Sequence, residues 1–119
     1  MTRPEIVKMA IAAHGQWKTR LKAAVESRKS EHTVESASTD RTCEFGKLLY
    51  GDPSLKAGAP VEFEKVRKLH AEFHQEVGKV LTLALAGKQV QAMASFEPNT
   101  PLTKISSELT LEMLKWSRV

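Results

Sequence analysis

A long segment between residues 60 and 86 repeats its apolar residues at steps of three and four positions. This spacing places side chains on one face of an α-helix, and an apolar face must be buried against other elements. We therefore predict a helix from about Pro60 to Ala86 that ends at Gly87. Its buried face comprises Phe63, Val66, His70, Phe73, Val77, Leu81 and Ala84.

The N-terminal segment carries a second pattern of the same kind. Thr2 is the expected N-cap, Pro4 falls in the first turn, and the helix is predicted to continue to about Ser27. The predicted buried face contains Ile6, Ala10, His14 or Ala13, Trp17, Leu21, and Ala24 or Val25.

The residues between these two helices are more polar. Their Ser and Thr content predicts a loop over 27–40. Asp40 is then expected to cap a short helix, RTCEFGKLLY, with Cys43 in its first turn. This helix should stop at Gly51, and GDPSLKAGAP reads as a second linker.

The C-terminal part is helical in pattern but contains Pro98 and Pro101. We expect a short helix to about Phe96, a break, and a final helix from about Pro101 to Trp116. No run alternates apolar and polar residues as a β-strand does. The sequence thus predicts one all-α domain over 1–119, an antiparallel four-helix bundle with a short accessory helix carrying the cysteine.

Composition bears on partners and compartment. The net charge is +4, but basic and acidic residues are interleaved, as in EFEKVRKLHAE, so we expect solvated helix faces and no nucleic-acid partner. The most apolar run, VLTLALAG, is shorter than the ~18 residues of a membrane span, and the N-terminus lacks the apolar core of a signal peptide. The single cysteine cannot form an internal disulfide. We expect a cytoplasmic protein without membrane insertion.

The histidines and the cysteine are the residues whose side chains could bind a metal or react. His70 and His74, four positions apart, lie on one side of their helix and could share a metal ion. His14 could supply a third nitrogen and Cys43 a thiolate, a mixture that Zn²⁺ accepts in a closed tetrahedral site. Each residue alone also has an ordinary explanation, as a core-edge histidine or a small buried thiol. A metal-independent helical interaction module is therefore the alternative.

Three motifs in order resemble the chemoreceptor zinc-binding domain family of bacteria. They are HGQW from His14, CEFGKLL from Cys43, and HAEFH from His70 to His74, and the resemblance covers roughly positions 10 to 80. It implies one zinc ion bound by His14, Cys43, His70 and His74. It also implies a helical bundle that often forms a homodimer, and a sensory role beside a chemoreceptor or a diguanylate cyclase.

Enzymatic activity is not expected, and we assign no catalytic residue. A zinc protease needs H-E-x-x-H, but Ala71 follows His70 here. Four protein ligands would also leave no open position for water or substrate. The paired Glu-x-x-His motifs of di-iron bundle enzymes do not occur in the sequence.

The cysteine suggests how such a centre could respond. Cys43 is expected near the start of a short helix between two flexible linkers, where the helix dipole favours a thiolate that can be oxidised. We expect zinc or an oxidant to change the ligation of Cys43 and so to signal to a chemotaxis or cyclic-di-GMP output partner. No output segment is recognisable in the sequence, so that partner is either a separate protein or a domain of a longer chain.

Other residues near the motifs have expected structural roles. His32, in the polar loop, is expected to be solvated. Trp17 and Phe73 are expected to wall the site by packing, and Phe45 to anchor the short helix. Gly46 is expected to allow a close approach to a neighbouring helix.

Overall fold

Helices form all the regular secondary structure of the computed structural model, which describes residues 2–30 and 32–118. None of these described residues lies in a β-strand, so the predicted all-α class is confirmed. The elements are α1 (Arg3–Ser27), α2 (Val34–Ser38), α3 (Glu44–Gly51), the 3-10 turn η1 (Pro53–Leu55), α4 (Pro60–Leu85), α5 (Gln89–Ala94) and α6 (Pro101–Ser117).

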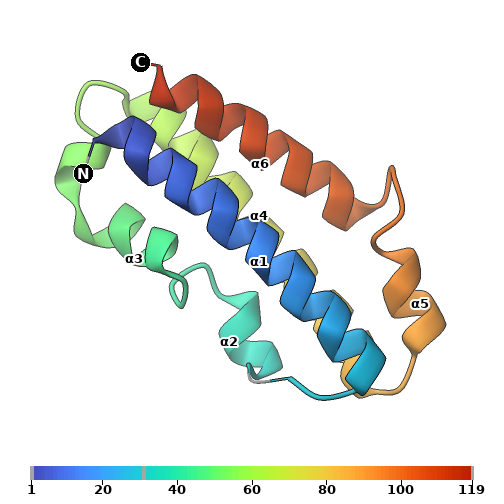
Figure 1. Cartoon of the computed structure of the whole chain (residues 1–119). Coiled ribbons are helices and arrows are strands. Elements are labelled where there is room, and N and C mark those ends of the chain that lie inside the picture. Colours follow the sequence, from blue (N-terminus) through green and yellow to red (C-terminus); the bar gives the residue numbers. More distant parts are fainter. Residues whose placement is uncertain (1, 31, 119) are drawn as a thin grey trace.

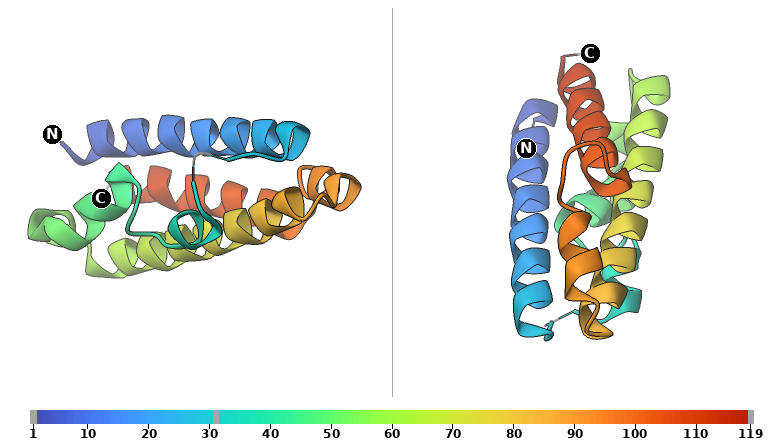
Figure 2. Two further views of the ribbon diagram at one scale, coloured as in Figure 1. Left: turned by 90° about the horizontal axis from the view of Figure 1, so that it is seen from below. Right: turned by 90° about the vertical axis from the view of Figure 1, so that its right-hand side faces the viewer.

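The three long helices α1, α4 and α6 pack against one another and form the body of the molecule (Figure 1). α1 and α4 run in the same direction, and α6 runs opposite to both. Between α1 and α4 the chain returns along the side of the body through α2 and α3 (Figure 2). The predicted antiparallel bundle of four helices is not confirmed, because the two long neighbours α1 and α4 are parallel.

The composition of the return segment explains why it forms no long helix. Only Ala37 of α2 is buried, whereas α3 buries Phe45 and Leu49. Ser and Thr side chains also bond to nearby backbone groups and compete with helix formation. Thr33 instead caps α2, accepting from the Ser36 N–H at 3.0 Å. The predicted loop over 27–40 therefore contains one short helix, α2, rather than none.

The two long apolar faces are buried as predicted. Every residue assigned to the buried face of α4 is buried, and on α1 His14 rather than Ala13 faces the core. α6 closes the third side of the core with the side chains of Leu102, Ile105, Leu109, Met113 and Trp116. Full burial of a large apolar side chain stabilises a fold by about 1.5–3 kcal/mol, so these faces determine the packing of the long helices.

The predicted ends of the outer helices are also confirmed. Thr2 caps α1 in a capping box with Glu5, and Thr100 caps α6, which has Pro101 in its first turn. Proline is well tolerated there because the first helical N–H groups have no partner within the helix. The break between α5 and α6 contains Pro98.

The predicted start of the short cysteine-bearing helix is wrong. α3 begins at Glu44, and its N-cap is Cys43 rather than Asp40. The Cys43 side chain accepts the Gly46 N–H, which an Asp, Ser or Thr side chain does at most N-caps. Cys43 therefore lies just before the helix and not within its first turn.

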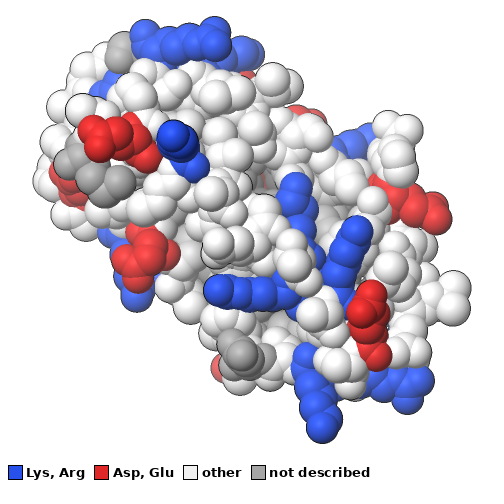
Figure 3. All heavy atoms as spheres, viewed as in Figure 1, with Lys and Arg blue, Asp and Glu red and all other residues white. Residues whose placement is uncertain are grey.

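Charged side chains of both signs are spread over the face of the molecule in Figure 3. Ion pairs join residues three positions apart within helices, namely Lys47 with Glu44, Arg67 with Glu64, Lys79 with Glu76, and Lys115 with Glu112. Exposed pairs of this kind contribute about 0–1 kcal/mol, so they do not determine the fold. Within the described ranges, no helix is both long and apolar enough to span a bilayer.

Candidate metal centre

His70 and His74 lie on consecutive turns of α4 and are completely buried, at 0% exposure. Their ring centroids are 4.7 Å apart. The four-residue spacing places both rings on one side of the helix, and the apolar residues around them turn that side inward. α4 thus presents two neighbouring imidazoles to the core.

α1 brings His14 to the same place. Its ring centroid lies 4.9 Å from that of His70 and 5.8 Å from that of His74, and its side chain is 5% exposed. One turn further along α1, Trp17 packs edge-on against His74 with ring centroids 5.2 Å apart. Because α1 and α4 run in the same direction, their turns meet in the same order: His14 lies beside His70, and Trp17, one turn later, lies beside His74.

Cys43 approaches the histidines from the turn before α3. Its Sγ lies 3.2 Å from the Nε2 of His70, and the Gly46 N–H donates to the sulfur at 3.4 Å. The side chain is 9% exposed. The N-cap position therefore holds the sulfur against α4 and gives it one backbone donor.

The four residues form one cluster with a ligand atom from each. The ligand atoms of His14, Cys43, His70 and His74 all lie within 4.8 Å of one another. Ligand atoms of a tetrahedral zinc site lie about 3.3–3.8 Å apart, so movements on the order of 1 Å separate this cluster from ligating geometry. The structure brings together all four residues that the sequence singled out.

Several ring nitrogens of this cluster lack hydrogen bonds. Among the described residues, neither Nδ1 nor Nε2 of His14 has a partner, and Nδ1 of His70 and Nε2 of His74 have none. A buried polar atom without a partner costs about 1–3 kcal/mol, and native proteins rarely leave several together. A metal ion accepts such nitrogen lone pairs, so these residues fit a bound zinc ion.

The remaining nitrogen of His74 is held by α2. His74 Nδ1 lies 3.0 Å from the carbonyl oxygen of Ala37, which makes it the donor and leaves Nε2 free for the cluster. α2 can reach α4 because Gly78 has no side chain, since a Cβ there would lie 1.9 Å from Ser38 Oγ. The Ala37 carbonyl is a functional group that sequence reasoning missed, because a backbone oxygen leaves no signal in residue type.

Aromatic rings surround the cluster. Phe73 and Phe45 pack edge-on against His14 with ring centroids at 5.1 and 5.7 Å, which fits the packing roles predicted for them. His32 is not simply solvated as predicted, since its ring lies 4.6 Å from that of Trp17 and is only partly exposed. His32 does not belong to the cluster and packs beside Trp17.

Burial changes the pKa values of the three histidines. The pKa of His14 is lowered to about 3, chiefly by burial and then by the nearby His74 and Lys18. The pKa of His70 is lowered to about 2, again chiefly by burial and then by His14 and His74. The pKa of His74 is lowered by burial, against the opposing effect of its bond to Ala37. Without metal, all three imidazoles are therefore neutral at pH 7, the form that ligates metals.

These pKa values predict acid sensitivity of the metal-free protein. The unfolded histidines bind protons below about pH 6.5, whereas the folded ones do not, so the free energy of unfolding should fall as pH drops from 6.5 and stay level above 7. Each histidine contributes up to about 1.4 kcal/mol per pH unit. Urea unfolding of chelator-treated protein between pH 5 and 8 measures this slope. His70→Leu should reduce it, and a slope that His70→Leu leaves unchanged would contradict the assignment.

The pKa of the Cys43 thiol moves in the opposite direction from the one predicted. Burial raises it, and the backbone N–H groups of Gly46 and Phe45 only partly offset that effect. The expectation that the helix start alone favours a thiolate is therefore wrong, because the sulfur is too deeply buried. A bound cation is the agent that would hold the sulfur in its ionised form.

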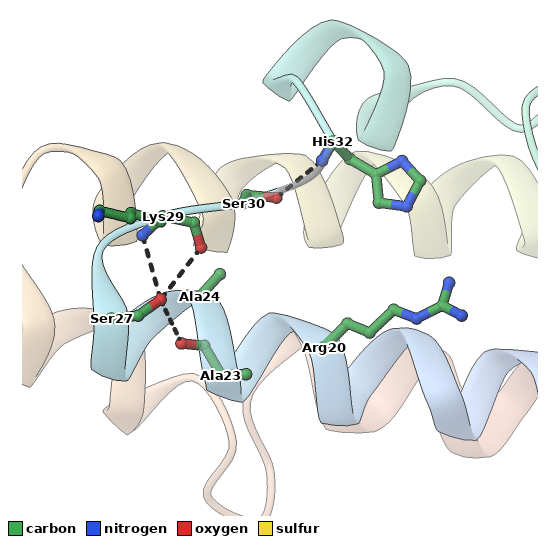
Figure 4. Close-up of a pocket in the computed structure, with 7 residues that line it drawn as sticks. All are labelled: Arg20, Ala23, Ala24, Ser27, Lys29, Ser30 and His32. Carbon is green, nitrogen blue, oxygen red and sulfur yellow. Dashed lines mark hydrogen bonds between the residues drawn. The ribbon is translucent and has the colours of Figure 1, made fainter.

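The described surface also has a separate cavity of about 230 Å³ near the C-terminal end of α1, shown in Figure 4. Its polar groups bond to one another: Ser27 Oγ donates to the Ala23 carbonyl and accepts from the Lys29 N–H, and Ser30 Oγ accepts from the His32 N–H. None of the four cluster residues lines it. The cavity is therefore distinct from the candidate metal centre.

Comparison with known proteins agrees with the motif pattern. A family model for the chemoreceptor zinc-binding domain matches residues 14–81, more than half of the chain. The matched range begins at His14 and includes Cys43, His70 and His74. Neither the curated proteins nor the solved structures contain a match to this chain.

Proposed function

Because this chain belongs to the chemoreceptor zinc-binding domain family, we propose that it binds one zinc ion through His14, Cys43, His70 and His74. The observation that carries the proposal is the meeting of these four ligand atoms within 4.8 Å in a buried part of the core. Bound zinc would supply positive charge that keeps the Cys43 sulfur ionised. The residues themselves hold α1, α4 and the turn before α3 together around the site.

The ligand set supports a regulatory rather than a catalytic role. Three nitrogens and one sulfur complete a tetrahedral sphere, so no position is left for water or substrate. Ala71 occupies the place where a zinc protease carries its glutamate. Apolar rings also pack against the cluster, with Phe45 and Phe73 beside His14.

Metal analysis of the purified protein tests this function. The wild type is expected to carry about one zinc per chain, and His14→Ala and His70→Ala to carry far less, because each removes a ligand. His32→Ala is the matched control, since it removes a histidine outside the cluster and should keep the metal. A folded wild type without zinc would contradict the proposal and favour the metal-independent interaction module.

We also propose that Cys43 makes the centre responsive to oxidants. The Cys43 sulfur is the one soft, oxidisable ligand of the set, and it is held by the short helix α3 rather than by a long one. With hydrogen peroxide, the thiolate sulfur attacks one peroxide oxygen, the O–O bond breaks, and hydroxide leaves. The cysteine becomes a sulfenic acid while the peroxide is reduced, and the oxidised sulfur is a poorer ligand.

Zinc release under oxidation tests this role of Cys43. Hydrogen peroxide is expected to release zinc from the wild type, as measured with a coloured zinc chelator. Cys43→Ser should bind zinc more weakly at the start and show no further release with peroxide. If Cys43→Ser bound zinc as tightly as the wild type, the proposed ligation and its regulatory consequence would both fail.

We further propose that the domain forms a homodimer and passes its ligation state to a chemoreceptor or a diguanylate cyclase. The family assignment supports a sensory role, and α6 leaves Leu111 and Leu114 exposed at 59% and 39%, three positions apart on its outer side. An exposed apolar pair on a regular helix is a suitable contact for a second copy. Sedimentation of the wild type against Leu111→Glu, with and without chelator, measures the association.

A further inference from the structure

The turn between α2 and α3, residues 39–43, determines where Cys43 lies. Asp40 in this turn is buried at 9% exposure, and a buried carboxylate needs hydrogen-bonding partners. It accepts a hydrogen bond from the hydroxyl of Tyr50, which lies near the end of α3. The bond therefore joins the two ends of the segment that carries Cys43.

Two arginines flank this bond. The guanidinium of Arg41 lies 4.1 Å from the centre of the Tyr50 ring, and Arg67 of α4 lies beside Tyr50. Burial and the bond to Asp40 raise the pKa of the Tyr50 hydroxyl, against the opposing effect of Arg67. Tyr50 thus stays protonated and serves as donor, with Asp40 as acceptor.

The main chain of Asp40 packs against Gly46 of α3, which lies beside His70 of the cluster. Gly46 allows this contact, since a Cβ there would lie 1.6 Å from the Asp40 carbonyl oxygen and 3.3 Å from Cε1 of His70. The Gly46 N–H also donates to Cys43 Sγ at 3.4 Å. A series of contacts therefore runs from Asp40 through Gly46 to both Cys43 and His70.

We propose that Asp40, held by Tyr50, is a positioning residue that places the Cys43 sulfur for metal binding. The proposal rests on the four-ligand site proposed above and adds a residue outside it. Asp40 does not cap α3, so its burial is not explained by helix capping. Its bond across the turn restricts the one ligand that no long helix holds, whereas the three histidines are fixed by α1 and α4.

Cobalt titration of the metal-free protein separates this role from general stability. Co²⁺ bound by a thiolate shows a sulfur-to-cobalt charge-transfer absorption, which reports the Cys43–metal contact directly. Tyr50→Phe removes only the hydroxyl donor, and Asp40→Asn replaces one accepting carboxylate oxygen with a donating NH₂ group. Each is expected to weaken Co²⁺ binding by about 10–100-fold, the usual effect of removing a partner that orients a ligand, and to reduce this absorption.

The matched control is Asp52→Asn, because Asp52 caps η1 in the same region without contacting the cluster. It should bind Co²⁺ like the wild type. A double-mutant cycle then tests whether Asp40 acts through the Cys43 sulfur. If it does, Asp40→Asn should cause no further loss of Co²⁺ affinity in the Cys43→Ser background.

Two results would overturn the proposal. One is unchanged affinity and absorption in Tyr50→Phe and Asp40→Asn. The other is an equal loss from Asp40→Asn with and without Cys43, which would show a purely structural effect. A wild type that binds Co²⁺ without sulfur absorption would instead overturn the four-ligand site itself, so the two failures are distinguishable.

Discussion

Removal of zinc from the folded protein is expected to lower the free energy of unfolding by about 4 kcal/mol, at a free zinc concentration about a thousandfold above Kd. The reason is that a zinc ion held by the proposed ligands would bind only the folded protein, where residues from α1, α4 and the turn before α3 meet. At about 2–8 °C per kcal/mol, the melting temperature should fall on the order of 10–30 °C. Thermal unfolding followed by circular dichroism, before and after chelation, measures the change.

The ligand variants provide the internal comparison for this experiment. His70→Ala should melt at nearly the same temperature with and without zinc, because its site is incomplete. His32→Ala should retain the full zinc-dependent shift, since His32 only packs on Trp17. An equal response to chelator in His70→Ala and the wild type would show that the stabilising metal binds elsewhere.

Gly46→Ala is expected to be among the most damaging single-methyl changes in the described structure. The added Cβ would lie 1.6 Å from the carbonyl oxygen of Asp40. This neighbour is backbone and cannot rotate away, so the turn holding Cys43 must move. We expect a loss of stability at the upper end of the about 1–3 kcal/mol typical of overpacking, and at least about 10-fold weaker zinc binding.

Gly15→Ala is the matched control for this substitution. Gly15 lies next to His14 in α1, and a Cβ there would meet nothing within 4 Å. Alanine should stabilise the helix by roughly 0.5–1 kcal/mol and leave zinc affinity unchanged. If both glycine variants bound zinc equally well, the close contact between Gly46 and Asp40 would have no part in forming the centre.

Sequence periodicity was sufficient to find the three histidines. His14, His70 and His74 lie on helix faces whose other members are apolar. Burial of those faces directs the three imidazole rings into the core. The limits of α1, α4 and α6 were predictable for similar reasons, since Thr2 and Pro101 mark helix starts and the apolar spacing runs without interruption.

The surroundings of Cys43 were not predictable in the same way. The choice of Cys43 over Asp40 as N-cap depends on Asp40 bonding to Tyr50, ten positions away. The support of His74 by the Ala37 carbonyl depends on α2 packing against Gly78. Such contacts arise from tertiary packing between segments, and local sequence preferences do not contain that information.

The parallel course of α1 and α4 also determines how far apart the ligands lie along the chain. Parallel neighbours need a long return segment, and Cys43 and His70 are separated by 27 positions. A disulfide closing a loop of this length would restrict the unfolded chain by about 3–4 kcal/mol, but a protein with a single cysteine cannot form one. A metal bridge would instead be lost on unfolding, so it would join these distant segments only while the protein is folded and would open again when the metal leaves.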